Sequence, residues 1–139
     1  MRYLALLLFC FVGASVFAQS VVPAEPASSA LSPGIGYPTV QAALEALQAK
    51  PGVQIQTTRP DSWTIASEPG DVQWSFTPNS HSAYPAVVRR VIKMKPDGGI
   101  FIEMSALCQA EKTACDKLIA DFKELNERIG QSVRSQVKK

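Results

Sequence analysis

Short segments of alternating apolar and polar residues, separated by turn-forming residues, occupy the middle of this 139-residue chain. In the clearest of them, Val72, Trp74 and Phe76 alternate with Gln73, Ser75 and Thr77, a period of two that is typical of a half-buried β-strand. Similar segments lie near residues 53–56, 63–65, 86–95 and 100–105. The Pro-Asp-Gly-Gly tetrad before the last segment predicts a β-hairpin. The short links favour an antiparallel sheet of about five strands.

Helical spacing of apolar residues flanks this strand-rich region on both sides. Thr39 is the expected N-cap of a first helix over 40–49. A second helix is expected to start from Thr113, in a capping box with Asp116, and to end near Gly130. Its apolar stripe comprises Cys115, Leu118, Ile119, Phe122, Leu125, Ile129 and Val133. The prediction is an α+β fold, in which an N-terminal and a C-terminal helix cover one face of the sheet.

The first residues have the form of a cleavable signal peptide, predicted at 1–18. Arg2 precedes an apolar run, and Val16 and Ala18 supply tolerated residues before cleavage ahead of Gln19. A retained anchor is the alternative, but the run of about 16 residues is shorter than the roughly 20 that span a bilayer. We therefore expect a periplasmic or secreted protein with no stable membrane span after cleavage.

The rest of the chain divides into a linker and one domain. Residues 19–36 are rich in Pro, Ala, Ser and Gly without apolar periodicity, which indicates a flexible linker. Residues 37–139 are expected to form a single domain. Removing the signal peptide lowers the formal charge from +2 to about +1, without the clustered basic residues of a nucleic-acid binder.

Cys108 and Cys115 remain after the signal peptide, with Cys10, is removed. An even number of cysteines in an exported protein favours a disulfide. On one continuous helix their Cα atoms would lie about 10.5 Å apart, beyond the roughly 7 Å that a disulfide tolerates. A helix that starts at Thr113 leaves Cys108 in the preceding loop, free to fold back. The C-x₆-C spacing does not match redox motifs, and one histidine with two cysteines does not predict a metal site. No cofactor is expected.

The expected strand before the hairpin carries four cations, Arg89, Arg90, Lys93 and Lys95. Because side chains alternate between the faces of a strand, Arg89, Lys93 and Lys95 share one side and Arg90 lies on the other.

Arg90 is the least expected residue on its face, since its neighbours there are apolar. A buried partner such as Glu103 or Asp121 would explain it, as would an edge strand that Arg90 protects. A bound ligand anion is the functional alternative.

Aromatic residues on alternating strand positions have two interpretations. Trp63, Trp74 and Phe76 are expected to pack in the core, and an aromatic platform for a sugar or peptide is the alternative. His81, the single histidine, lies in a loop that also contains Tyr84. It would be the general base of a hydrolase, but no G-x-S-x-G or S-x-x-K motif supplies a nucleophile.

The chain resembles a group of short exported proteobacterial proteins of unknown function, some of which have J-domain chaperone names. The resemblance runs through Tyr37-Pro38-Thr39, Trp63-Thr64-Ile65, Trp74-Ser75-Phe76-Thr77-Pro78, His81, Pro85-Ala86-Val87-Val88-Arg89-Arg90 and Cys108 with Cys115-Asp116. The J-domain name does not fit, because His81 is followed by Ser82-Ala83 and no His-Pro-Asp tripeptide exists. The resemblance implies export and a disulfide, and no activity.

Together these features predict a non-catalytic exported module that binds a protein or a cell-envelope component. The candidate binding residues are Trp74, His81, Tyr84, Arg89 and Arg90. The alternatives are a small envelope hydrolase that uses His81 and a structural or assembly protein.

Overall fold

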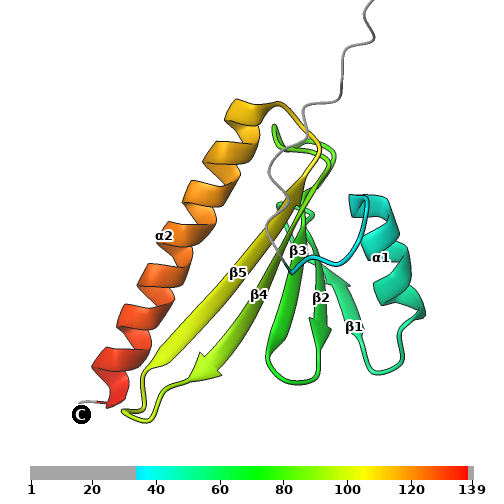
Figure 1. The fold of residues 1–139 in the computed structure, drawn as a ribbon. Coiled ribbons are helices and arrows are strands. Elements are labelled where there is room, and N and C mark those ends of the chain that lie inside the picture. Colours follow the sequence, from blue (N-terminus) through cyan, green and yellow to red (C-terminus); the bar gives the residue numbers. More distant parts are fainter. Residues whose placement is uncertain (1–33, 138–139) are drawn as a thin grey trace, which may run out of the picture.

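A five-stranded antiparallel sheet with a helix on either side forms the described part of the protein, residues 34–137 of a computed structural model (Figure 1). The strands follow one another across the sheet in chain order. The elements are α1 (Val40–Ala49), β1 (Gln54–Thr57), β2 (Thr64–Glu68), β3 (Val72–Phe76), β4 (Ala86–Met94), β5 (Ile100–Cys108) and α2 (Lys112–Val137). The α+β class and the five strands are as predicted. The predicted signal peptide at 1–18 and most of the predicted linker lie outside the described residues.

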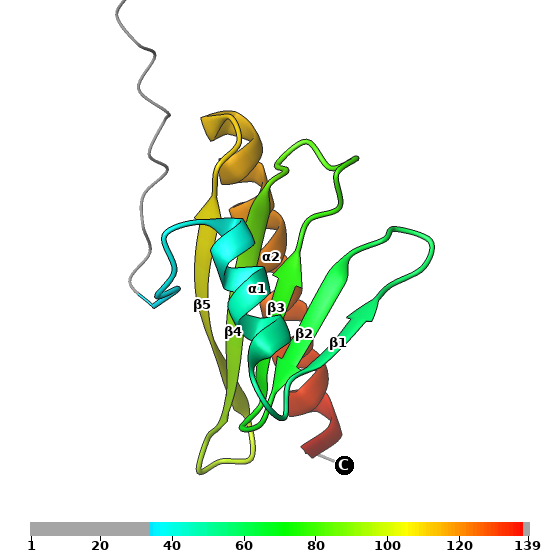
Figure 2. The ribbon, with the colours of Figure 1, turned by 90° about the vertical axis from the view of Figure 1, so that its right-hand side faces the viewer.

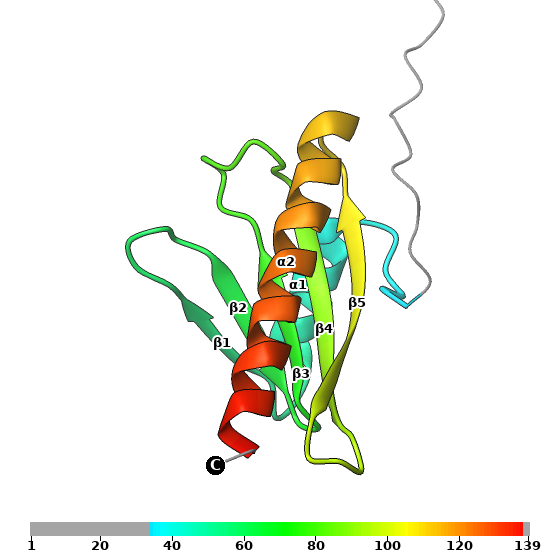
Figure 3. The ribbon, with the colours of Figure 1, turned by 90° about the vertical axis from the view of Figure 1, so that its left-hand side faces the viewer.

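The two helices cover opposite faces of the sheet, so the expectation that both would share one face is wrong. Figures 2 and 3 show α1 in front of one face and α2 in front of the other. The reason lies at the start of β4, where Ala86, Val87 and Val88 are all buried. Val87 packs below α1, while Ala86 and Val88 pack below α2. Consecutive apolar residues indicate a strand that is buried on both sides.

The core below α1 begins earlier in the chain than the sequence indicated. Thr39 caps α1 as predicted, because its hydroxyl accepts a hydrogen bond of 3.1 Å from the Ala42 amide. The core comprises Ile35, Val40, Ala43, Leu47, Ala66, Trp74, Phe76, Val87 and Leu107. Ile35 falls within the predicted linker, so the folded region starts before Tyr37. Gly34 has a φ of +117°, and a Cβ there would lie 2.8 Å from the Ser105 hydroxyl, so this position favours glycine.

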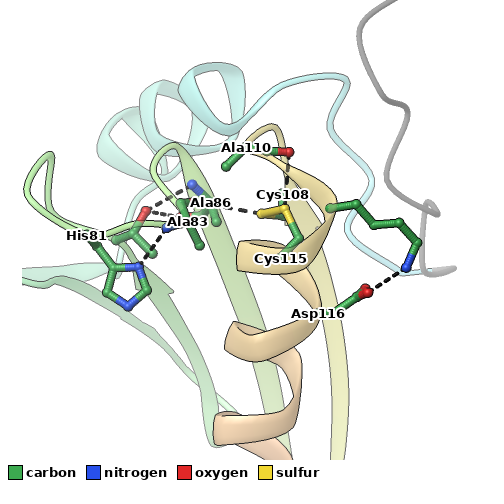
Figure 4. The surroundings of a disulfide bond; sticks show 9 residues. His81, Ala83, Ala86, Cys108, Ala110, Cys115 and Asp116 are labelled. Atoms are coloured by element: carbon green, nitrogen blue, oxygen red, sulfur yellow. Dashed lines mark hydrogen bonds and ion pairs between the residues drawn. A yellow bond between two sulfur atoms is a disulfide. The ribbon is translucent and has the colours of Figure 1, made fainter.

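A disulfide joins the end of β5 to the first turn of α2. The Cα atoms of Cys108 and Cys115 lie 5.8 Å apart. Their sulfur atoms lie 3.7 Å from the Ala83 carbonyl oxygen and 3.4 Å from the Ala110 carbonyl oxygen, respectively (Figure 4). The predicted pair is therefore present, although Cys108 ends a strand instead of lying in a loop. The core on this side comprises Ala83, Ala86, Val88, Ala106, Cys108, Cys115, Leu118 and Phe122.

Both predicted ends of α2 are wrong. The Cys115 amide donates to the Glu111 carbonyl at 3.0 Å. This helical hydrogen bond is accepted by a residue before Thr113, so the helix starts earlier than predicted. Asp116 pairs with Lys112 instead of closing a capping box. The helix also continues past Gly130 to Val137. Within the described range, no helix combines the length and apolar character that crossing a membrane requires.

Candidate ligand-binding groove

The structure distributes the five predicted binding residues over both faces of the sheet. Trp74 and Arg89 lie on the α1 side, and the Arg89 guanidinium carbon is 5.5 Å from the centre of the Trp74 ring. Arg90 faces α2, where it lies over Phe122. The side chain of Tyr84 is exposed and lines a cavity beside α1. The five therefore do not form one surface.

Trp74 belongs to the core, as the alternation of β3 predicted. Only 3% of it is exposed, and Tyr37 packs against its ring edge with the ring centres 5.9 Å apart. Its indole N–H donates to the Glu68 carboxylate, which also pairs with Lys50. Partial burial raises the pKa of Glu68, but the hydrogen bonds from Lys50 and Trp74 outweigh it, so the pKa lies below its ordinary value. This cluster anchors the β2–β3 hairpin to α1.

A groove of about 450 Å³ lies on the opposite face, between α2 and the β2–β3 half of the sheet. Its lining residues are Thr58, Asp61, Trp63, Ile65, Ser75, Arg90, Asp121, Phe122, Leu125 and Arg128. The Trp63 and Phe122 rings meet edge to face with their centres 5.8 Å apart. Trp63 is therefore separated by the sheet from Trp74, and the two do not form a joint platform. The groove combines an apolar wall with two arginines, Arg90 and Arg128, and two aspartates, Asp61 and Asp121.

Arg90 enters this groove without a carboxylate partner. Its Nη2 donates to Gln73, its Nη1 lies 3.5 Å from the Asn126 amide oxygen, and its carbon lies 5.4 Å from the centre of the Phe122 ring. Among the described residues, its Nε is the one buried side-chain polar atom without a hydrogen-bond partner. Burial lowers the pKa of Arg90, because it disfavours the charged form.

Neither predicted partner neutralises Arg90. Glu103 pairs with Lys93 at 2.7 Å, and the pairing register places both on the α1 side of the sheet. Asp121 lines the same groove as Arg90 but pairs with Lys117 at 2.7 Å. Protection of an edge is also not the explanation, because β4 is hydrogen-bonded on both sides.

His81 organises the loop between β3 and β4. Its Nδ1 accepts a hydrogen bond of 3.0 Å from the Ala83 amide, and its own amide donates to the Pro78 carbonyl at 3.0 Å. Its ring lies against the edge of Trp63, with 5.2 Å between the centres. His81 therefore packs against Trp63, which lines the groove, and one of its ring nitrogens is used within the fold.

Sequence reasoning connected α2 with Arg90 only through Asp121, and did not include Leu125 or Arg128 among the binding residues. Asp121, Leu125 and Arg128 recur with a helical spacing of four and three residues, next to the apolar stripe that contains Phe122. Charged residues at the margin of such a stripe were the available signal. No group of three or more possible metal-ligating side chains occurs in the region from Gly34 to Val137.

Comparison of the chain with models of protein families, with curated proteins and with solved structures yields no match. The geometry of the groove therefore carries the functional argument.

Proposed function

We propose that the protein is an exported, non-catalytic binding module, and that its groove holds a carboxylate next to an apolar group. The observation that carries this proposal is Arg90, a half-buried cation with amide partners and no anionic one in the described chain. Buried charges are costly, and proteins normally pair them. A ligand carboxylate would supply the missing counter-charge.

The lining of the groove matches such a ligand. The guanidinium of Arg90 would bind a carboxylate through charge-assisted hydrogen bonds, and Arg128 adds a second cation. Of the two aspartates in the lining, Asp121 is paired with Lys117, and Asp61 offsets the charge of one arginine. Trp63, Phe122 and Leu125 provide apolar surface beside them. A protein chain offers this combination at an aspartate, a glutamate or a C-terminus beside an apolar side chain. A carboxylated component of the cell envelope offers it as well.

Export is part of this proposal. Two observations support export. The Cys108–Cys115 disulfide is of a kind that persists in oxidising compartments, and residues 1–18 have the form of a signal peptide.

The test is an NMR titration with two matched probes, N-acetylphenylalanine and N-acetylphenylalanine amide. They share the aromatic ring, and only the first carries a carboxylate. We expect the acid to bind at least about tenfold more tightly, since a charge-assisted hydrogen bond contributes about 1.5–3 kcal/mol. The side-chain Nε–H signal of Arg90 should shift with the acid and not with the amide.

Two variants with the same change of charge separate the groove from general electrostatics. Arg90→Gln should abolish the preference for the acid, whereas Lys93→Gln, on the same strand but the opposite face, should retain it. Equal binding of acid and amide by the unmodified protein would contradict the proposal without recourse to any variant. Loss of the preference in Lys93→Gln would also contradict it.

A further inference from the structure

A second cavity, of about 440 Å³, lies on the α1 side of the sheet. The first turns of α1, the start of β2 and the connection between β3 and β4 surround it, and Figure 2 shows these segments at the same end of the sheet. It is lined by Val40, Gln41, Leu44, Ser62, Thr64, Phe76, Thr77, Pro78, Asn79, Tyr84, Pro85 and Gln109. None of these lining residues is charged, in contrast to the groove on the other face.

Several main-chain groups around this cavity are already hydrogen-bonded. The Val40 amide donates to the Gln109 side-chain oxygen at 2.9 Å, and the Ala86 amide donates to the Thr77 hydroxyl at 2.9 Å. The Gln109 amide donates to the Pro85 carbonyl at 2.9 Å. These three amides are therefore occupied within the fold, and side chains supply the polar groups considered next. At the start of α1, the Val40 and Ala42 amides are satisfied by the side chains of Gln109 and Thr39.

The side chains that remain are neutral groups that both donate and accept hydrogen bonds. Thr64 and Tyr84 present hydroxyls and Asn79 presents an amide, and within the described chain none of these three side chains has a hydrogen-bond partner. Tyr84 is 51% exposed, so its ring is accessible from solvent. Pro78 and Pro85 supply aliphatic surface beside this ring.

We infer that this cavity is a binding site for a short neutral saccharide. The hydroxyls of a sugar also donate and accept, which matches Thr64, Asn79 and Tyr84. The C–H face of a pyranose packs against an aromatic ring such as that of Tyr84. The volume lies within the range of ligand sites, about 300–1,000 Å³.

An uncharged peptide is the competing ligand. Extended peptides are commonly held through main-chain hydrogen bonds to a free strand edge. The main-chain amides named above are instead bonded within the fold, and the polar surface consists of side-chain hydroxyls and amides. The observations therefore favour the saccharide, and the peptide becomes an outcome of the test.

The experiment is an NMR titration of the folded protein with N,N′-diacetylchitobiose, a neutral disaccharide. We expect saturable shifts of the Thr64, Asn79 and Tyr84 amide signals, with a dissociation constant on the order of 1 mM. Tyr84→Ala should weaken binding at least about tenfold. The matched control is Phe101→Ala, which removes an equally exposed aromatic ring from β5, outside the cavity. Asn79→Ala provides a second variant if Tyr84→Ala does not fold.

Three results would overturn the inference. One is the absence of shifts in the three cavity signals at saturating disaccharide. Another is an equal loss of binding in Phe101→Ala. The third is binding, at these signals, of a peptide with blocked ends comprising residues 26–33, which has no charged side chain, when the disaccharide does not bind. Arg90→Gln should leave saccharide binding unchanged, so the outcome is independent of the carboxylate groove.

Discussion

The disulfide between β5 and α2 provides a quantitative test of how this fold is held together. Its loop is short, with seven residues of separation. In the chain-entropy account, a loop of that length stabilises the folded state by about 2.4 kcal/mol, because the cross-link restricts the unfolded chain. Both cysteines are buried, with exposed fractions of 4% and 1%. Replacing both by alanine removes two buried sulfur atoms, and the resulting void adds about 1 kcal/mol.

Urea unfolding, monitored by circular dichroism, measures the contribution of the disulfide and the additional cost of the void. Reduction of the unmodified protein should lower the free energy of unfolding by about 2.4 kcal/mol, and the Cys108→Ala/Cys115→Ala variant should lower it by about 3.4 kcal/mol. The first value corresponds to a decrease in Tm of roughly 10–19 °C. The alanine variant should not respond to the reductant, which is the control. A difference below about 0.5 kcal/mol between the oxidised and reduced forms would refute the reasoning, since the loop entropy would then be compensated elsewhere.

Two other predictions concern pH and processing. Because the pKa of Glu68 is lowered from 4.5 in the folded state, its stabilising contribution is fully present above the unfolded pKa and is lost as the pH falls through the folded pKa. Glu68→Gln should therefore show a smaller fall in Tm than the unmodified protein between about pH 5 and pH 3, and an identical fall in both would contradict this. Export predicts that protein isolated from the periplasm has the mass of Gln19 to Lys139 minus two hydrogens, without free thiols. A full-length chain with free thiols would argue against export.

The positions of the strands could be predicted from sequence because turn-forming residues separate them and several alternate between apolar and polar residues, although β4 begins with the consecutive buried residues Ala86, Val87 and Val88. β3, Val72–Phe76, lies within the alternating segment predicted at 72–77, and the β4–β5 hairpin follows from its Pro-Asp-Gly-Gly tetrad. The start of α1 was predictable because Thr39 is a local signal. The ends of α2 were not, because Thr113 and Gly130 are permissive residues. Ala114, Ile119 and Leu125 pack against the core below α2, all of them between the two predicted ends, so this apolar pattern does not mark where the helix starts or stops.

The candidate site was harder to predict than the fold, and Arg89 and Arg90 show why. The alternation of β4 predicted that these consecutive residues face opposite sides of the sheet, and the structure confirms it, with Arg89 at Trp74 and Arg90 at Phe122. The candidate set nevertheless grouped both with Trp74 as binding residues, because the sequence did not show that a helix covers each face. The same separation applies to residues 63–65, where Trp63 and Ile65 line the groove and Thr64 lines the cavity beside α1. Once both faces of a sheet are covered, neighbours in sequence belong to different sites. Each site is completed by a helix that comes from far along the chain. A functional surface in such a fold can therefore be assigned only after the helices have been placed on their faces, which neither composition nor periodicity determines here.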